Sequence, residues 1–488
     1  MKNISNKFAF WVALGRIGSM LVVFAMPLFL TRVLNRSDYG TFSQFFTLYS
    51  ALYVILGCGV HASLFFFYPT ASKSDRDKYA TNALISLLLL TLISYSVLNI
   101  SFIQNLFLGD SELSQFKVEI ILCIVLAIPT NMIGPLYTVS EDKIGALIIP
   151  SCAAIIRIGV IVVIASLVKD LFFVFWGLVF YQIFILFFIL FYTFRKHCFS
   201  FDGKLLKAQL AYSIPFGGMV ALQLLSNYFD KIVSIHFIPP LQYAIYSVAF
   251  LSIPGINQIY DSLCQVNIVN MTKCYHENNK NMVVELYKDF VTRMLSFSVP
   301  IILAVVLFAN EIVSFLYPDN YQSAANFFRI YSLTFITAMF GAGTILRAVN
   351  KTSLSLKAYL ITCIVGLPIT YWLIKQWGIH GAIVSAVINI LLPRVLQMGC
   401  EMYVTKSSFR HFLPCKNIFS ILFFSGLFLL PLVLAEYLCS LSIVHCVVLS
   451  LVYVIACYIE FINKNVFIVN KNWIEMTIKK FIVMKKFN

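Results

Sequence analysis

Charged residues are scarce in this sequence. Asp, Glu, Lys and Arg make up 12% of the 488 residues, whereas hydrophobic residues make up 60%. Soluble globular chains carry about 25% charged and about 45–50% apolar residues. A soluble fold of this length could not bury so much apolar surface, so the excess must face lipid. The composition therefore predicts an integral membrane protein.

Catalytic and metal-binding motifs are also missing. The sequence contains no P-loop, no GxSxG and no HExxH pattern, which argues against a P-loop ATPase and against the common hydrolase and metalloprotease sites. Its 12 Cys form no CxxC pair and lie mostly in apolar stretches, as small buried hydrophobic residues do. We expect no enzymatic activity, no cofactor and no metal.

Long apolar runs recur along the whole chain. A bilayer core about 30 Å thick needs about 20 apolar residues per helix. Continuous runs such as 171–194 lack the alternation of barrel strands. The pattern predicts an all-α integral membrane protein with about 14 transmembrane helices. The predicted spans lie near residues 8–30, 41–67, 81–103, 118–138, 144–168, 171–194, 210–237, 241–268, 290–317, 325–348, 355–375, 379–402, 418–438 and 443–463.

The net charge of +15 follows the membrane topology. Most Lys and Arg fall in alternate connections between the predicted spans, and the N-terminal segment belongs to the same set. Cytoplasmic loops carry such an excess of basic residues. The charge pattern predicts that both termini are cytoplasmic, and it gives no reason to expect a nucleic-acid partner.

Two segments spaced 204 residues apart resemble each other. LNRSDYGTFS at 34–43 and IPPLQYAIYS at 238–247 each connect two predicted spans and carry a Tyr before a small residue. Parallel six-helix repeats are a known transporter plan. We predict two six-helix pseudo-repeats plus a C-terminal helix pair. The predicted order is an N-terminal half at 1–194, a cytoplasmic linker at 195–209, a second half at 210–402, the helix pair at 403–463 and a basic cytoplasmic tail at 464–488.

Several charged residues fall inside predicted spans. A charge at the bilayer centre costs about 2.5–3.5 kcal/mol on insertion scales, so it needs a partner or a wet cavity. Basic side chains in a central cavity would attract an anionic substrate, and acidic ones could couple transport to a proton or sodium gradient. The alternative is that these residues pair with one another. The candidates for substrate binding are Arg16, Arg157, Lys231 and Arg394, and those for ion coupling are Asp230 and Asp261.

Three stretches carry a resemblance to a known family. Residues 27–67, with TRVLNRSDYG, are similar to the first two spans of polysaccharide-transport flippases. Residues 212–237, with an Asp230-Lys231 pair, resemble the seventh helix of that family, and GIHGAIVSA at 378–386 resembles the start of its twelfth span. The two prolines near 239 depart from the usual glycine-containing turn. The family belongs to the multidrug/oligosaccharidyl-lipid/polysaccharide exporter superfamily.

The resemblance implies a Wzx-type flippase in the bacterial cytoplasmic (inner) membrane. Such a protein moves O-antigen or capsule repeat units, linked to undecaprenyl pyrophosphate, from the cytoplasmic to the periplasmic leaflet. It implies membrane lipid, a glycan polymerase and a chain-length regulator as further partners. The alternatives are a multidrug exporter of the same superfamily, a flippase for a lipid-linked peptidoglycan or teichoic-acid precursor, and a membrane glycan polymerase. The shortness of the outside loops disfavours the polymerase.

Overall fold

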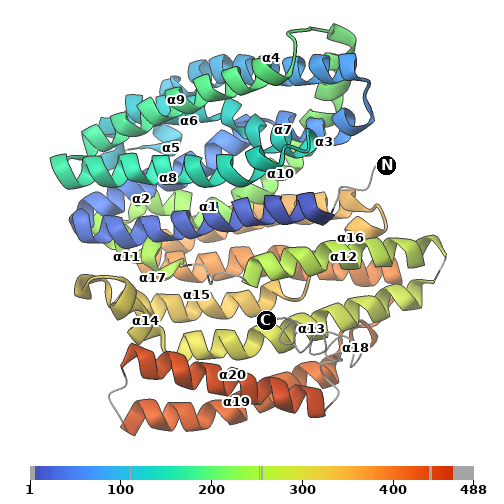
Figure 1. Ribbon diagram of the computed structural model, residues 1–488. Coiled ribbons are helices and arrows are strands. Elements are labelled where there is room, and N and C mark those ends of the chain that lie inside the picture. The colour runs from blue at the N-terminus through green and yellow to red at the C-terminus, as the bar shows by residue number, and fades with distance from the viewer. Residues whose placement is uncertain are drawn as a thin grey trace, which may run out of the picture. The chain divides into compact units, whose positions relative to one another are not determined.

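The structure is a computed structural model that describes residues 6–109, 111–251, 253, 256–277, 279–438 and 442–464. Every regular element in this part of the chain is an α- or 3₁₀-helix (Figure 1). The chain divides into two compact units. Unit 1 comprises Met1–Val248 and Tyr359–Asn389, and unit 2 comprises Ala249–Ala358 and Ile390–Asn488. The predicted all-α class is confirmed.

Unit 1 is built from long helices that pack along their lengths. Helix α8 lies against α1 and α9, α6 against α9, and α2 against α10. The helices are α1 (Asn6–Val33), α2 (Arg36–Leu56), α3 (Ser63–Phe67), α4 (Lys73–Leu98), α5 (Ser101–Phe107), α6 (Lys117–Ala127), α7 (Ile133–Val139), α8 (Lys143–Val168), α9 (Leu171–Lys196), α10 (Gly203–Phe237) and α11 (Pro240–Ala249).

Polar residues in the connections set where these helices begin. The side chains of Asn35, Ser72, Asp142, Asp170 and Asp202 each accept a hydrogen bond from a backbone N–H in the first turn of the helix that follows. A free N–H at a helix start is costly unless a side chain or water satisfies it. The short polar connections between apolar runs are therefore the caps that fix the helix starts.

The two similar segments found in the sequence lie against each other in unit 1. Arg36 Nε donates to the carbonyl oxygen of Leu241 at 3.0 Å, and Gln44 Nε2 donates to that of Ile238 at 3.3 Å. A Cβ on Gly40 would lie 1.8 Å from the carbonyl oxygen of Pro240. The start of α2 and the start of α11 can approach this closely only because residue 40 is glycine.

Helix α17 (Thr352–Thr405) folds back on itself at Gly378. This residue has φ 54° and ψ −128°, a backbone conformation that favours glycine. Asn389 Nδ2 donates to Thr370 Oγ1 at 2.9 Å, so the two arms run side by side. Gly378 lies between the predicted spans 355–375 and 379–402, so the break in the helix coincides with the predicted boundary between them.

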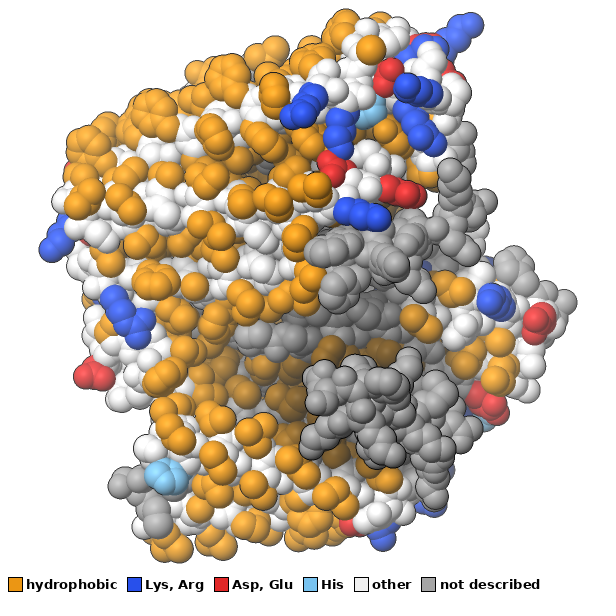
Figure 2. All heavy atoms as spheres, in the orientation of Figure 1, with side chains coloured by type: hydrophobic (Ala, Val, Ile, Leu, Met, Phe, Trp, Pro, Cys, Tyr) orange, Lys and Arg blue, Asp and Glu red, His pale blue; other side chains and the backbone are white. Residues whose placement is uncertain are grey.

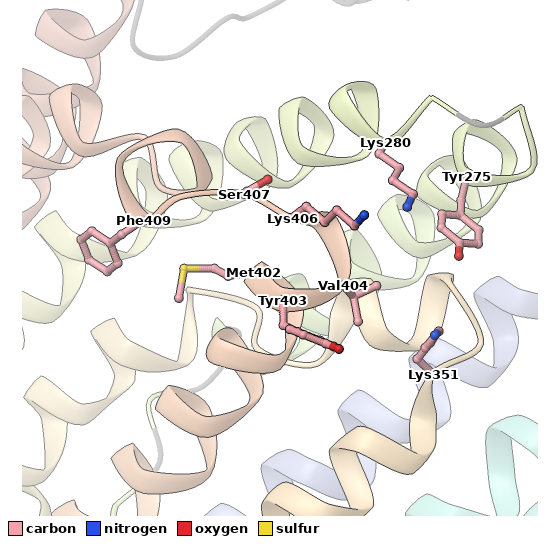
Figure 3. Close-up of a pocket in the computed structure, with 9 residues that line it drawn as sticks. All are labelled: Tyr275, Lys280, Lys351, Met402, Tyr403, Val404, Lys406, Ser407 and Phe409. Atoms are coloured by element: carbon pink, nitrogen blue, oxygen red, sulfur yellow. The ribbon is translucent and has the colours of Figure 1, made fainter.

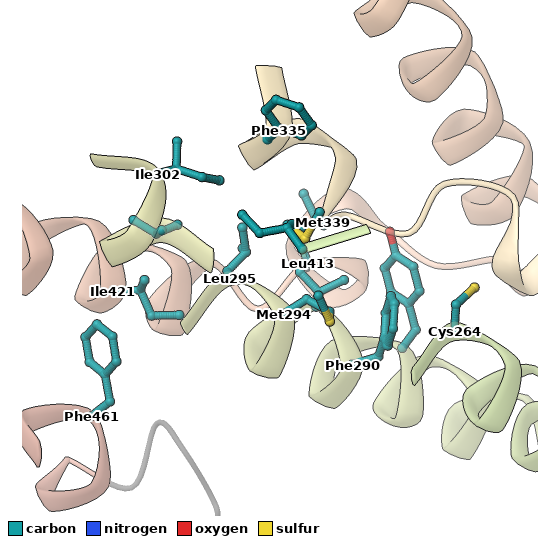
Figure 4. Packing of buried hydrophobic residues seen from close by; sticks show 14 of the residues in the cluster. Cys264, Phe290, Met294, Leu295, Ile302, Phe335, Met339, Leu413, Ile421 and Phe461 are labelled. Carbon is teal, nitrogen blue, oxygen red and sulfur yellow. The ribbon is translucent and has the colours of Figure 1, made fainter. Parts of the chain in front are cut away.

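Unit 2 is organised around α13, which contacts α12, α15, α19 and α20. In its core, Phe290, Met294 and Leu295 of α13 pack with Ile421 and Phe461 of the C-terminal helices (Figure 4). Besides parts of α17, its helices are α12 (Ile256–His276), α13 (Lys280–Leu307), α14 (Ala309–Leu316), α15 (Ala324–Ala338), α16 (Thr344–Ala348), α18 (Phe409–Phe412), α19 (Cys415–Leu438) and α20 (Ile443–Asn463).

Apolar side chains cover the flanks of the helices, and charged side chains gather near helix ends (Figure 2). Among the described residues, nine helices are long and apolar enough to cross a membrane, or ten if α2 and the bent Val60–Phe67 segment form one span. The chain is thus a multi-pass membrane protein. The count of fourteen stays a prediction, as do the boundaries of the two halves. The predicted basic tail lies almost entirely outside the described residues.

Candidate substrate site

Arg157 lies on the packed face of α8. It is three residues after Ala154 and four before Ile161, both of which are buried, so all three share one side of the helix. Its guanidinium carbon lies 5.7 Å from the ring centroid of Phe46. Its Nε is buried and makes no hydrogen bond to any described residue. This site therefore holds a cation with an open hydrogen-bond donor.

Aromatic side chains surround that cation. Phe45, Phe46 and Tyr49 of α2 line the same narrow pocket as Arg157, together with Gln182 of α9. Gln182 Nε2 donates to the hydroxyl of Tyr49 at 2.7 Å, which fixes the ring. The ring of Tyr49 stacks on that of Tyr53, one turn further along α2, with centroids 5.1 Å apart. The arrangement sets closely packed aromatic rings next to a guanidinium, with Tyr49 only 8% exposed.

Asp230 and Lys231 of α10 form an ion pair. Their Oδ2 and Nζ atoms are 3.4 Å apart, and Asp230 is 1% exposed. The hydroxyl of Tyr246 in α11 also donates to Asp230 Oδ2. Lys231 Nζ lies 5.5 Å from the ring centroid of Tyr228. A buried carboxylate needs hydrogen-bonding or charged partners, and Lys231 and Tyr246 are the partners of Asp230.

Tyrosines accompany both basic residues in unit 1. Tyr53 stacks on Tyr49, which lines the Arg157 pocket, and the ring of Tyr228 faces Lys231. Tyr49 and Tyr53 belong to α2 and Tyr228 to α10, and these two helices pack against each other. We call the set Arg157, Tyr49, Tyr53, Tyr228, Asp230 and Lys231 the Arg157–Lys231 cluster. Two cations separated by tyrosines can bind an anion next to a polar ring such as a sugar.

The other predicted residues lie elsewhere. Arg394 belongs to unit 2, where its Nη1 donates to the carbonyl oxygen of Thr334 at 3.3 Å and to Thr337 Oγ1. Arg16 lies on α1 and Asp261 on α12, but their side chains fall outside the described residues. The structure thus brings Arg157, Asp230 and Lys231 into one unit, and it holds Arg394 in a hydrogen-bonded setting in the other.

One buried charge was missed in the sequence. Glu401, near the end of α17, is fully buried in unit 2, and its Oε1 accepts from the backbone N–H of Ile345 at 2.9 Å. The signal was a lone Glu in the stretch MGCEMYV, at the end of a predicted span. The tyrosines of the cluster were missed too, although Tyr49 and Tyr53 show the i, i+4 spacing of one helix face. In the described chain, no group of three or more His, Cys, Asp or Glu could hold a metal.

Asp142, in the connection before α8, fixes the helix that carries Arg157. Burial raises the pKa of its carboxyl, but hydrogen bonds from Lys196, the Gly145 N–H and Tyr192 outweigh this and lower the pKa to about 2. The Tyr192 hydroxyl lies 2.7 Å from the carboxylate, and the Gly145 nitrogen 2.9 Å. Because Tyr192 and Lys196 belong to α9, this carboxylate ties α8 to α9.

The fold and the cluster define a multi-pass membrane protein with a basic, aromatic site among its helices. The sequence model of one family, described as polysaccharide biosynthesis protein, matches residues 6–266, more than half of the chain. The chain therefore belongs to that polysaccharide biosynthesis protein family. A search of curated proteins found no match.

Solved structures share the fold. One is described as the lipid II flippase MurJ in an inward closed conformation. It has 14% identity and a TM-score of 0.71, with 93% of this chain and 99% of that chain covered. Another is an inward-facing multidrug resistance MATE family transporter of the MOP superfamily. It has 15% identity and a TM-score of 0.59, with 80% of this chain and 94% of that chain covered. A third is a MOP superfamily transporter from Pyrococcus furiosus, described as having a binding pocket of reverse polarity. It has 13% identity and a TM-score of 0.51, with 82% of this chain and 94% of that chain covered.

Proposed function

We infer that this protein is a flippase for lipid-linked oligosaccharides. Its cargo is an O-antigen or capsule repeat unit on undecaprenyl pyrophosphate, which it carries from the cytoplasmic to the periplasmic leaflet. The observation that carries this proposal is Arg157, a half-buried cation whose Nε has no partner among the described residues. Membership of the polysaccharide biosynthesis family supports the glycan part of the cargo.

The cluster supplies chemistry that suits such a head group. A guanidinium presents its N–H donors in a planar fork that matches two phosphate oxygens. The open Nε of Arg157 would be satisfied by the pyrophosphate, and the rings of Tyr49 and Tyr53 would bind the first sugar once a conformational change separates them, since they are packed together here. Lys231 adds a second cation, which Asp230 partly neutralises. No covalent bond changes, so the proposed activity is transport by alternating access.

The remaining parts of the proposal follow from the sequence pattern. We place the protein in the bacterial inner membrane with both termini in the cytoplasm, and we take the two six-helix halves as the moving bodies. Asp230 and Asp261 are the proposed residues for coupling to a proton or sodium gradient, and Arg16 and Arg394 are further proposed contacts for the cargo. A glycan polymerase and a chain-length regulator would act on the delivered unit.

Depletion of the protein in its source cell tests the proposal. Undecaprenyl-linked glycans would be extracted after treatment with a membrane-impermeant glycan-modifying probe. We expect single repeat units to accumulate unmodified, facing the cytoplasm, while surface polysaccharide is lost. Units that reach the outer leaflet but stay unpolymerised would contradict transport and indicate a polymerase.

A flippase for a lipid-linked peptidoglycan precursor is the second candidate. The observation that favours it is the match over 93% of this chain to a structure described as a lipid II flippase. The same depletion separates the two: loss of cell-wall synthesis with intact surface polysaccharide would identify the peptidoglycan precursor. Export of cationic drugs is less compatible with the cluster. The cluster presents two basic side chains, which repel cations, and its one carboxylate is already paired with Lys231.

A further inference from the structure

A second basic site lies in unit 2, at the open end of the α17 hairpin. A cavity of about 580 Å³ is bordered there by the start of α13, the start of α17 and the end of α17. Lys280, Lys351 and Lys406 come from these three places and extend toward the space beside Tyr275 (Figure 3). The fold therefore brings together three lysines that are far apart in the sequence.

No described acidic residue balances the charge of this cavity. Among the described residues, no Asp or Glu lines it, and none of the three lysines forms an ion pair. Helix α17 begins here with Lys351 at its N-cap, and no side chain caps its first turn. The free N–H groups of a helix start add positive partial charge. Neighbouring like charges repel unless an anion lies between them, so the cavity favours an anionic ligand.

The surroundings indicate that this ligand is part of a lipid. The cavity lies at the ends of two long apolar helices, α13 and α17, both of which qualify as membrane spans. Tyr403 is 80% exposed and Phe409 is 55% exposed at its edge, and Met402 adds an apolar wall. Exposed aromatic residues beside lysines are typical of the level of the lipid headgroups. A soluble anion would gain nothing from the apolar wall, whereas an acyl or prenyl chain would.

We propose that the cavity formed by Lys280, Lys351, Lys406 and Tyr275 binds the phosphate of a lipid headgroup. The lysines act as point charges on the phosphate oxygens, and the Tyr275 hydroxyl can donate to the same group. The lipid chain runs along Met402 and Phe409 toward the apolar flank. The site does not depend on the proposed transport function, since any lipid with a net anionic phosphate headgroup fits it.

Native mass spectrometry of the full-length protein in detergent tests the proposal. The protein is titrated with dioleoylphosphatidylglycerol, and with zwitterionic dioleoylphosphatidylcholine for comparison. The test variant carries Lys280→Gln, Lys351→Gln and Lys406→Gln. The control carries Lys273→Gln, Lys288→Gln and Lys357→Gln, which removes the same charge from unit 2 outside the cavity. A thermal melt of each variant verifies folding.

We expect phosphatidylglycerol to bind the test variant about tenfold more weakly than the unaltered protein, and the control within about twofold. Equal weakening in both variants would mean that net charge alone attracts the lipid, and would overturn the site. Unchanged binding in the test variant would overturn it as well.

Two further titrations separate the sources of the phosphate. If inorganic pyrophosphate alone binds and displaces the lipid at equal concentration, the ligand is a soluble phosphate and the lipid assignment is wrong. Undecaprenyl pyrophosphate is compared with phosphatidylglycerol in the same way. Stronger retention of the former supports the proposal with the flippase cargo as occupant, and equal retention supports it with any anionic lipid. None of these measurements uses transport, so the two proposals can fail separately.

Discussion

The two units hold their intramembrane arginines differently. In unit 1, Arg157 contacts aromatic rings and keeps a buried donor without a partner in the described chain. In unit 2, Arg394 donates to Thr337 and Thr334. The buried Glu401 of unit 2 is intermediate: its Oε1 accepts from the backbone of Ile345, and its Oε2 has no partner in the described chain. A charge bound by its own protein stabilises a structure, whereas a charge with an open donor can bind something else. The comparison teaches that burial of a charge does not identify a site until its partners are known.

The largest expected effect is on transport, from Arg157→Ala. Loss of a charge-assisted contact to pyrophosphate should lower translocation by about 100-fold, ~2.7 kcal/mol. The measurement is the amount of repeat unit that reaches an impermeant probe, with membrane levels checked by immunoblot. Arg195→Ala, which removes an exposed guanidinium at the end of α9, is the control. Full activity of Arg157→Ala would remove the basis of the proposed site.

Glu401→Ala should change stability instead. Without the carboxylate, the buried N–H of Ile345 loses its acceptor and a cavity forms, at a cost of about 2 kcal/mol. Thermal unfolding in detergent would measure this loss. Glu401→Gln keeps an acceptor and should retain most of the stability, and Glu285→Ala, at an exposed position of α13, serves as the control. A stable Glu401→Ala protein that fails to transport would contradict a structural role and assign Glu401, whose Oε2 has no described partner, to transport.

Tyr246→Phe tests how much the hydrogen bond from Tyr246 to the buried Asp230 stabilises unit 1. The substitution removes one donor to the buried Asp230 and should destabilise the protein by about 1.5 kcal/mol. Tyr437→Phe, at an exposed position of α19, gives the reference value in the same melting experiment. An unchanged melting temperature would show that Lys231 alone satisfies Asp230.

Asp142→Ala should have the smallest effect, about 1 kcal/mol, because the residue is a helix cap near solvent. The folded-state pKa of about 2 lies below the usual value, so this carboxylate stabilises the fold above about pH 4 and the contribution is lost as the pH falls toward about 2. Melting curves at pH 7 and at pH 3 measure both effects. The difference between the two proteins should shrink at the lower pH, and a constant difference would exclude this role.

Much of the fold could be predicted because hydropathy reports directly on membrane helices. Most predicted spans contain a long helix, and the break at Gly378 falls between two predicted spans. Other predicted spans are interrupted within their length. The second bends between α2 and the Val60–Phe67 segment, and the tenth is broken between α15 and α16. The fourth is interrupted at Pro129, where α6 gives way to a 3₁₀ turn before α7. A proline inside an apolar run does not tell whether a helix kinks or stops.

The candidate site could be predicted only in part. Charge in an apolar span drew attention to Arg157, Asp230 and Lys231. Adjacent residues on a helix do not face each other, so the ion pair between Asp230 and Lys231 could not be assumed. The tyrosines and the lysine cavity depend on which helices pack together, and that information is spread over distant segments. Periodicity along one helix does not contain it.

The contact between Gly40 and Pro240 bears on why the two similar segments differ in sequence. Gly40 and Ala244 occupy matching positions in these segments, and a Cβ at residue 40 would collide with the carbonyl oxygen of Pro240. Two segments that pack on each other cannot carry the same residues at every point of contact, since one must provide the space that the other fills. If the segments arose by duplication, the glycine in one and the proline in the other are the divergence that their packing requires.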